Sequence, residues 1–147
     1  MAYWIFKVNP LHYRIDDRLA DPEVRTTWQV TRYRDDIRAG DTAFIWRTGS
    51  NRRNRGLCAT MKITSDPIEM PEIESEIPYC IALDVGTQCR VMGELVERFP
   101  LICAQDIRVM PGLQRLSVFH GFQKATNFHV TEDEGRILGK LVAAGKC

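Results

Sequence analysis

The first two thirds of the chain alternate between short apolar runs and clusters of proline, glycine and charged residues. Runs of this length that are rich in aromatic and β-branched residues are typical of β-strands bounded by turns. The run TAFIWR at residues 42–47 is the most regular, and it follows directly after a Gly-Asp pair. The pattern predicts strands at residues 3–8, 26–30, 42–47, 56–64, 79–85 and 88–95.

The segment GLCATMKIT at residues 56–64 is predicted to be the return strand after residues 42–47. Its apolar residues recur at every second position, as expected for one face of a strand. The residues placed on that face are Leu57, Ala59, Met61 and Ile63.

Helical spacing predicts two short elements near the N-terminus. Residues 11–21 carry Leu11, Ile15 and Leu19 four positions apart, which favours a short helix. Residues 31–41 are interpreted as a helical turn, which Gly40 can end in the left-handed conformation.

The final helix has the clearest boundaries. Thr131 and Glu134 form a T-x-x-E capping box, in which each side chain bonds the other residue's backbone N–H. Gly145 can terminate this helix. Its apolar face is predicted to contain Ile137, Leu138, Leu141 and Val142.

Two segments are less regular. Residues 65–78 contain three prolines and many acidic residues, and are interpreted as a loop and a candidate mobile segment. Residues 101–109 fit a short helix or a strand equally well. Strands in the first part, short helices between them and a final helix indicate an α+β fold, a small curved sheet or barrel with helices at its side.

Composition agrees with one domain spanning residues 1–147. Of 147 residues, 44% are apolar and 27% are charged, which is ordinary for a globular protein that buries its own core. No apolar run reaches the length of a membrane helix, and the N-terminus lacks the features of a signal peptide. The expectation is a soluble, cytoplasmic protein.

Known catalytic and metal-binding motifs are absent from the sequence. The five cysteines have no zinc-type spacing, so they are interpreted as reduced thiols, and no metal or cofactor is expected. The sequence contains no nucleophile elbow, phosphate-binding loop or dinucleotide fingerprint. The adjacent pairs Asp16-Asp17 and Asp35-Asp36 are interpreted as exposed charges, and no catalysis is expected.

The net charge is only +1, but the charges are segregated along the chain. Residues 25–55 contain eight arginines and three aspartates, a net charge of +5. Residues 66–84 contain six acidic residues and no basic ones. The basic stretch favours polyanion binding. The alternative is that both stretches solvate the surface or face each other.

Aromatic residues lie close to this basic stretch and to a polar cluster. Trp28 and Trp46 lie beside arginine-bearing segments, and Phe119, Phe122 and Phe128 surround Gln123, Thr126 and Asn127. Aromatic faces stack bases, amides pair with base edges and arginines hold phosphates. These are the ingredients of a nucleic-acid reader, although each tryptophan could equally be a core residue.

Several stretches together resemble the EVE domain, a family of the PUA-like superfamily related to YTH domains. They are YWIFKVNP at the start, VTRYRDDIRAGDTAFIWRTG after Trp28, GLCATMKI, and QKATNFHVTEDEGRIL before and in the final helix. Two segments depart from the common family pattern. WQVTRY stands where the family usually has Trp-x-Gly-Val-Arg-Asn, and QKATNF stands where it usually has Gln-Gly-Thr-Asn-Phe.

The resemblance implies a PUA-like mixed β-barrel with flanking short helices and a C-terminal helix. It further implies a pocket for a modified base, a methylated or hydroxymethylated cytosine or adenine, in DNA or RNA. A separate nuclease or RNA-processing partner could act with it. The residues assigned to the base pocket are Trp4, Lys7, Trp28, Trp46, Thr48, Phe122, Gln123, Thr126 and Asn127.

The arginine-rich loop that follows Trp46 is assigned to the phosphate backbone. The residues concerned are Arg47, Arg52, Arg53 and Arg55. Strand alternation leaves open whether Trp46 faces the pocket or the core. Two other functions also remain open. One is a small-molecule carrier or enzyme that uses the same cavity, and the other is a protein-interaction module that docks a basic partner on residues 66–84.

Overall fold

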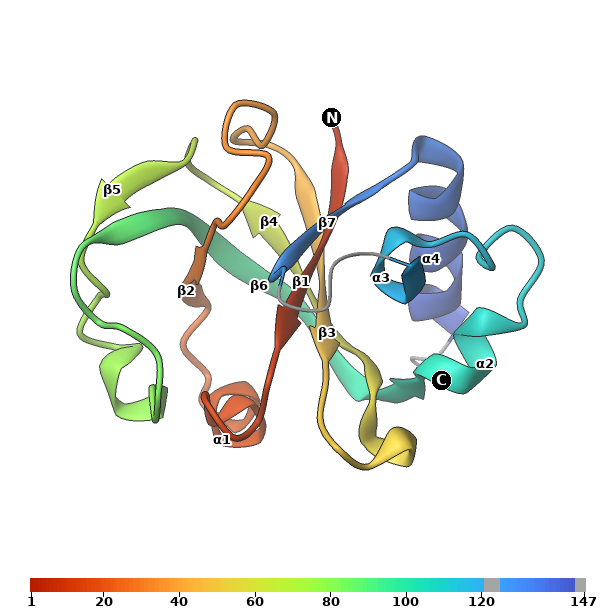
Figure 1. The fold of residues 1–147 in the computed structure, drawn as a ribbon, viewed down its shortest axis with the longest axis horizontal. Helices are drawn as coiled ribbons and strands as arrows, with labels where there is room; N and C mark the ends of the chain where they lie inside the picture. Colours follow the sequence, from red (N-terminus) through yellow and green to blue (C-terminus); the bar gives the residue numbers. More distant parts are fainter. Residues whose placement is uncertain (121–124, 145–147) are drawn as a thin grey trace.

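The computed structural model describes residues 1–120 and 125–144, and within them it has the α+β composition that the sequence predicts (Figure 1). The strands are β1 (Tyr3–Val8), β2 (Arg25–Gln29), β3 (Thr42–Arg47), β4 (Gly56–Ile63), β5 (Ile68–Met70), β6 (Gln88–Cys103) and β7 (Asn127–Val130). The helices are α1 (Ile15–Ala20), α2 (Ala104–Arg108), α3 (Ser117–His120) and α4 (Glu132–Ala144). Two 3₁₀ turns are η1 (Arg52–Asn54) and η2 (Ile77–Tyr79).

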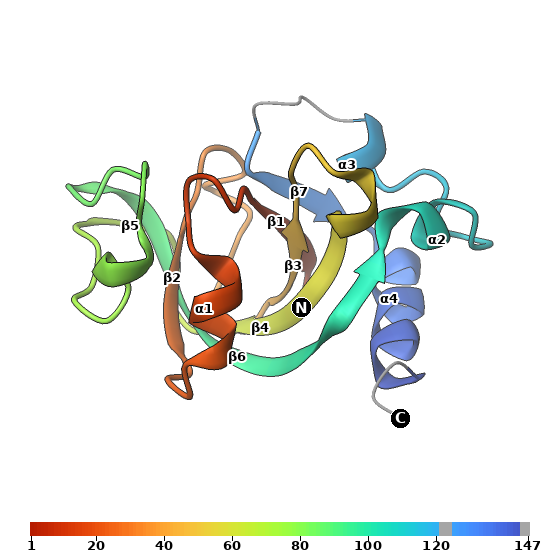
Figure 2. The same ribbon diagram turned by 90° about the horizontal axis from the view of Figure 1, so that it is seen from below.

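All seven strands form one sheet in the order β2-β6-β4-β3-β1-β7, with β5 also paired to β6. The pair β1 and β3 is parallel, and the other pairs are antiparallel. The 16-residue strand β6 curves along the sheet and pairs with β2, β4 and β5 (Figure 2). No ladder joins β2 to β7 in the described part of the chain, so the sheet is strongly curved rather than closed into the expected barrel.

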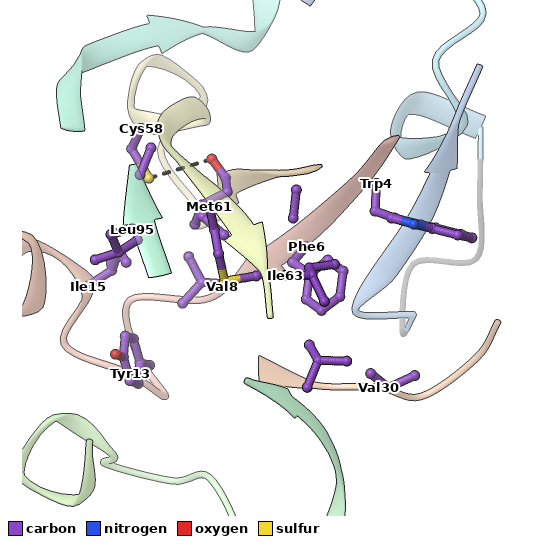
Figure 3. Packing of buried hydrophobic residues seen from close by; sticks show 14 of the residues in the cluster. Trp4, Phe6, Val8, Tyr13, Ile15, Val30, Cys58, Met61, Ile63 and Leu95 are labelled. Carbon is purple, nitrogen blue, oxygen red and sulfur yellow. Dashed lines mark hydrogen bonds between the residues drawn. The ribbon is translucent and has the colours of Figure 1, made fainter. Parts of the chain in front are cut away.

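Both faces of the central strands are buried. Along β1, Trp4, Phe6 and Val8 belong to one core cluster inside the curve of the sheet (Figure 3). Ile5, between them, belongs to a second cluster. The second cluster lies against α2, α3 and α4, which are grouped at one side of the sheet (Figures 1 and 2). Because neighbouring side chains of a strand point to opposite faces, two cores explain why these strands are almost continuously apolar.

The alternation predicted for residues 56–64 is correct only for part of the strand. Ala59, Met61 and Ile63 face the first core, but Leu57 faces the second. The pairing of β4 with β6 shifts register between Leu57 and Ala59. Such an irregularity adds a residue to one strand, and this reverses the faces on either side of it.

Residues 79–85 are not a strand, contrary to the prediction. Scattered bonds hold this segment in place of a regular ladder. The N–H groups of Ile81 and Ala82 both donate to the carbonyl of His12, and the Arg90 guanidinium donates to the carbonyl oxygens of Asp84 and Gly86. Of the segment predicted to be a loop, residues 65–78, part pairs with β6 as β5 and part forms η2.

Local geometry decides residues 31–41, interpreted as a helical turn, and residues 101–109, which fitted a helix or a strand. Residues 31–41 form turns in which Tyr33 has a positive φ of 63° and Gly40 one of 98°. Residues 101–109 are divided, because β6 ends at Cys103 and α2 begins at Ala104.

The capping box of the final helix is confirmed. The Thr131 N–H donates to the Glu134 carboxylate at 3.0 Å, and the Glu134 N–H donates to the Thr131 hydroxyl at 3.2 Å. Leu138 and Val142 are buried in the second core. The predicted terminator Gly145 lies outside the described residues. Among the helices that the structure describes, none is both long and apolar enough to cross a membrane.

Candidate functional site

A cavity of about 340 Å³ lies between β2 and the C-terminal end of β1. We call it the Trp28 cavity. Its lining comes from widely separated parts of the chain, which the curvature of the sheet brings together. The lining residues are Phe6, Lys7, Val8, Asn9, His12, Tyr13, Thr27, Trp28, Gln29, Thr48, Glu72, Leu83, Arg90, Ala125 and Thr126.

Trp28 is the half-buried aromatic residue of this cavity. The Trp28 and Phe6 rings form an edge-to-face pair with their centroids 6.4 Å apart. The Tyr13 ring packs against Trp28 with 5.8 Å between the ring centroids. The indole Nε1 is buried and has no hydrogen-bond partner within residues 1–120 and 125–144. These ring contacts fix the plane of the indole, so it can offer a pre-positioned aromatic surface.

The outer edge of β2 borders the same cavity. The N–H of Val30 donates to the carbonyl of Cys89 at 2.8 Å, so alternate residues of β2 face β6. Thr27 and Gln29, which line the cavity, therefore direct their backbone N–H and C=O groups away from β6. These backbone groups have no hydrogen-bond partner within the described chain.

The neighbouring positions on this edge are already occupied. On one side, Arg18 donates to the carbonyl of Arg25 at 2.7 Å. On the other, the N–H of Thr31 donates to the Asn127 Oδ1 at 3.0 Å. The unpaired part of the edge thus coincides with the cavity, where each extended residue presents a donor beside an acceptor.

Asn127 joins the two ends of the curved sheet. It is fully buried at the start of β7, and its Nδ2 donates to the carbonyl of Arg32 just beyond β2. With its Oδ1 on Thr31, its carboxamide replaces the missing ladder between β2 and β7. Asn127 was expected to read a base edge, but the structure places it outside the cavity lining, with both side-chain groups engaged.

The variant Asn127→Ala is expected to lower the free energy of unfolding by about 1–3 kcal/mol, because the Thr31 N–H and Arg32 carbonyl lose their partner. Amide hydrogen exchange at the end of β2 should also accelerate. Thr131→Ala is the control at the opposite end of β7. It should cost about 1 kcal/mol through the lost cap without changing exchange at β2. Unchanged exchange in Asn127→Ala would show that Asn127 does not hold the two ends together.

Glu72 and Arg90 form a polar part of the cavity lining beside Thr27. The Glu72 carboxylate accepts hydrogen bonds from the Thr27 hydroxyl and from the Ile73 N–H, and it pairs with Arg90 at 3.3 Å. The side chains of Glu72 and Arg90 are only 6% and 4% exposed. The sequence predicts only a loop here, because nothing in the local pattern distinguishes Glu72 from the acidic residues around it.

Lys7 lies where the Trp28 cavity meets a second hollow. Its ammonium group lies 5.2 Å from the centre of the Phe128 ring. Burial, and secondarily the charge of Arg32, lower the pKa of Lys7 below its usual value. The charge of Lys7 is therefore sensitive to any anion that enters either space.

The second hollow has a volume of about 690 Å³, and we call it the arginine groove. It shares Lys7, Asn9 and Thr48 with the Trp28 cavity. Its basic residues other than Lys7 are Arg52, Arg55 and Arg108. The two spaces therefore adjoin, with an aromatic cavity on one side and a cationic groove on the other.

Two of the four predicted phosphate-binding arginines do not line this groove. Arg47 pairs with Asp16 at 3.0 Å and donates to the carbonyl of Asn54 at 3.0 Å. Its guanidinium therefore stabilises the loop that contains η1. Arg53 is exposed on η1 but points to no described cavity. Arg108 was missed, because it follows the loop by more than fifty residues and carries no local signal.

Two of the three tryptophans are core residues rather than part of the Trp28 cavity. Trp4 is 1% exposed, and its Nε1 donates to Asp41 at 2.9 Å. Trp46 is 4% exposed in the second core, and its ring forms an edge-to-face pair with the ring of Phe119. Strand alternation turns Trp46 away from Trp28, although it borders the arginine groove.

Of the described residues predicted for the base pocket, four lie together at the Trp28 cavity: Lys7, Trp28, Thr48 and Thr126. Phe122 and Gln123 lie outside the described residues. Within the described ranges no group of histidine, cysteine and acidic residues could hold a metal ion. Burial raises the pKa of the Cys58 thiol to about 12, which makes it unreactive.

The EVE domain family model matches residues 2–141. No curated protein matches the chain in sequence. A solved structure of a hypothetical protein from Leishmania major is similar over 100% of this chain and 98% of its own, with 17% identity and a TM-score of 0.71. These values show a shared fold.

Two other solved structures contain nucleic acid. Human THYN1 in complex with 5-methylcytosine-containing DNA has a TM-score of 0.65 and 19% identity, covering 96% of this chain and 97% of THYN1. The YTH domain of Zygosaccharomyces rouxii MRB1, in complex with N6-methyladenosine RNA, has a TM-score of 0.55 and 10% identity, covering 96% and 83%. The family match, which spans nearly the whole sequence, shows that the chain belongs to the EVE domain family.

Proposed function

We propose that this protein binds nucleic acid and receives one modified base in the Trp28 cavity. The observation that carries the proposal is the unpaired edge of β2 beside an aromatic ring, in a cavity that opens next to a cationic groove. The similarity in fold to THYN1 and to a YTH domain, each in complex with methylated nucleic acid, supports it.

Each part of the site matches one part of a nucleotide. The Trp28 ring stacks on the base, which offsets the few kcal/mol that removing a base from its stack costs. The backbone groups of Thr27 and Gln29 pair with the donor and acceptor on the base edge. Lys7, Arg52, Arg55 and Arg108 hold the adjoining phosphates.

A modification adds affinity only if the cavity encloses it. Burying one methyl group contributes about 0.8 kcal/mol, which corresponds to roughly a fourfold preference. Stronger selection requires that an unmodified base leave a void or a poorly bonded water in the cavity. Lys7, Thr48 and Thr126 line the cavity, and their side chains are the ones that we expect to enclose the modification.

The proposal is tested by measuring binding to matched oligonucleotides. The set contains DNA and RNA, single-stranded and duplex, with cytosine or adenine either unmodified, methylated or hydroxymethylated. Tighter binding of one modified oligonucleotide than of its unmodified counterpart is expected. Binding of free nucleosides or metabolites with no preference for oligonucleotides would instead support a small-molecule carrier.

Arg52→Ala is expected to weaken binding to all oligonucleotides alike, because phosphate contacts carry no sequence information. The slope of log affinity against log salt should fall by about one. Arg53→Ala is the matched control, since it removes the same charge from the same exposed turn but outside the groove. Equal slopes for the two variants would remove the arginine groove from the interface.

A further inference from the structure

Glu72 is the one acidic residue among the described residues that line the Trp28 cavity, and hydrogen bonds fix the position of its carboxylate. Its carboxylate is held by the Thr27 hydroxyl, the Ile73 N–H and the Arg90 guanidinium. These bonds are divided unequally, since the first two use Oε1 and only the bond from Arg90, at 3.3 Å, uses Oε2. A carboxylate oxygen accepts two hydrogen bonds, so Oε2 retains acceptor capacity.

Arg90 fixes the position of Glu72 and of the segment that carries it. Besides Glu72, its guanidinium donates to the carbonyl oxygens of Met70 at 3.1 Å, Asp84 at 2.6 Å and Gly86 at 2.9 Å. Both ends of the segment that brings Glu72 to the cavity are therefore bonded to one side chain. The carboxylate is thus a fixed acceptor, because moving it would break several buried hydrogen bonds.

We propose that Glu72 is a specificity-determining residue, whose Oε2 accepts a hydrogen bond from the exocyclic amino group of the bound base. The substrate class is then a modified base that carries such an amino group, a cytosine or an adenine, rather than the corresponding keto base. This inference rests on the proposed function of the same cavity.

The physical reason is that a carboxylate accepts hydrogen bonds but does not donate them. It can accept an amino hydrogen, but a keto oxygen in the same place would bring two acceptors together in a buried site. A site that holds a polar group for bonding strongly rejects the analogue that cannot bond to it, since the group is then left unpaired. Carboxylates pair with the amino group of cytosine for this reason.

The test compares an oligonucleotide containing 5-methylcytosine with one containing thymine at the same position. These bases carry the same methyl group and differ in whether an amino or a keto group is present. The protein is expected to bind the 5-methylcytosine oligonucleotide at least about tenfold more tightly, as one good base contact allows. If the ligand proves to be N6-methyladenine, the corresponding keto base is hypoxanthine.

The variant Glu72→Gln should reduce this ratio to within about threefold, because an amide can either donate or accept. Glu74→Gln is the control, since Glu74 belongs to the same segment but is exposed and does not line the cavity. The control should keep the ratio of the wild-type protein.

The outcomes separate the two proposals. Binding of modified oligonucleotides with no amino preference in the wild-type protein would overturn the role of Glu72 and leave the proposed function standing. A preference for the keto base would do the same and would point to Arg90 as the contact. Absence of binding to any oligonucleotide would overturn the proposed function and, with it, this inference.

Discussion

Replacing Trp28 with alanine is expected to weaken binding of the preferred modified oligonucleotide by roughly 5- to 150-fold, the range for losing one base–aromatic stack. Trp28 is half-buried and supplies the indole face of the cavity. Equilibrium titration with a labelled oligonucleotide measures the loss. Binding of the unmodified oligonucleotide through the arginine groove should change less.

Trp28→Phe is the matched control. It keeps an aromatic face but removes the indole N–H, which has no partner among the described residues. Most of the affinity should therefore return, and circular dichroism should show the same fold for both variants. If Trp28→Ala binds as well as the wild-type protein, the base does not stack on Trp28 and the pocket assignment fails.

Replacing Arg18 with alanine is expected to lower the free energy of unfolding by about 3–5 kcal/mol. Arg18 and Glu76 form an ion pair at 2.9 Å, with side chains 2% and 1% exposed. Arg18 also bonds the carbonyl groups of Glu23 and Arg25. Its loss would leave a buried carboxylate unpaired and two carbonyls without a partner, and urea unfolding measures the cost.

Arg34→Ala is the control for this prediction. Arg34 pairs with Glu69 at 2.7 Å, but the two side chains are 56% and 51% exposed. An exposed pair contributes at most about 1 kcal/mol. Similar losses for Arg18→Ala and Arg34→Ala would show that burial does not set the contribution of the Arg18–Glu76 pair.

The Arg18–Glu76 pair also links stability to the site. Glu76 accepts a hydrogen bond from the Tyr13 hydroxyl, and the Tyr13 ring packs against Trp28. Burial, together with the charge and hydrogen bond of Glu76, raises the pKa of Tyr13 well above its usual value. Tyr13 therefore stays a neutral donor, and its ring holds one side of the cavity.

The sequence predicted those elements whose signal is local. The strands at residues 3–8 and 42–47 and the capping box at Thr131 depend on neighbouring residues, and all are confirmed. The face occupied by Leu57 could not be predicted, because it depends on a register shift against a distant strand.

The site was harder to predict because its parts meet only in three dimensions. Trp28 and Thr126 lie in one cavity because the sheet curves, and Glu72 joins them through Arg90. The acidic residues of 66–84 look alike in the sequence, yet Glu72 and Glu76 are buried with partners and Glu74 is exposed. Hydrophobic patterning cannot separate a buried carboxylate from a solvated one.

The contact between Thr31 and Asn127 has a consequence for synthesis of the chain. Ninety-six positions separate these residues, so the end of β2 stays unattached to β7 until Asn127 has left the ribosome. An uncovered strand edge is a template for pairing with other chains. The feature that prepares the cavity to hold a base also exposes the nascent protein to aggregation, and a chain stalled before Asn127 should be the form that most needs a chaperone.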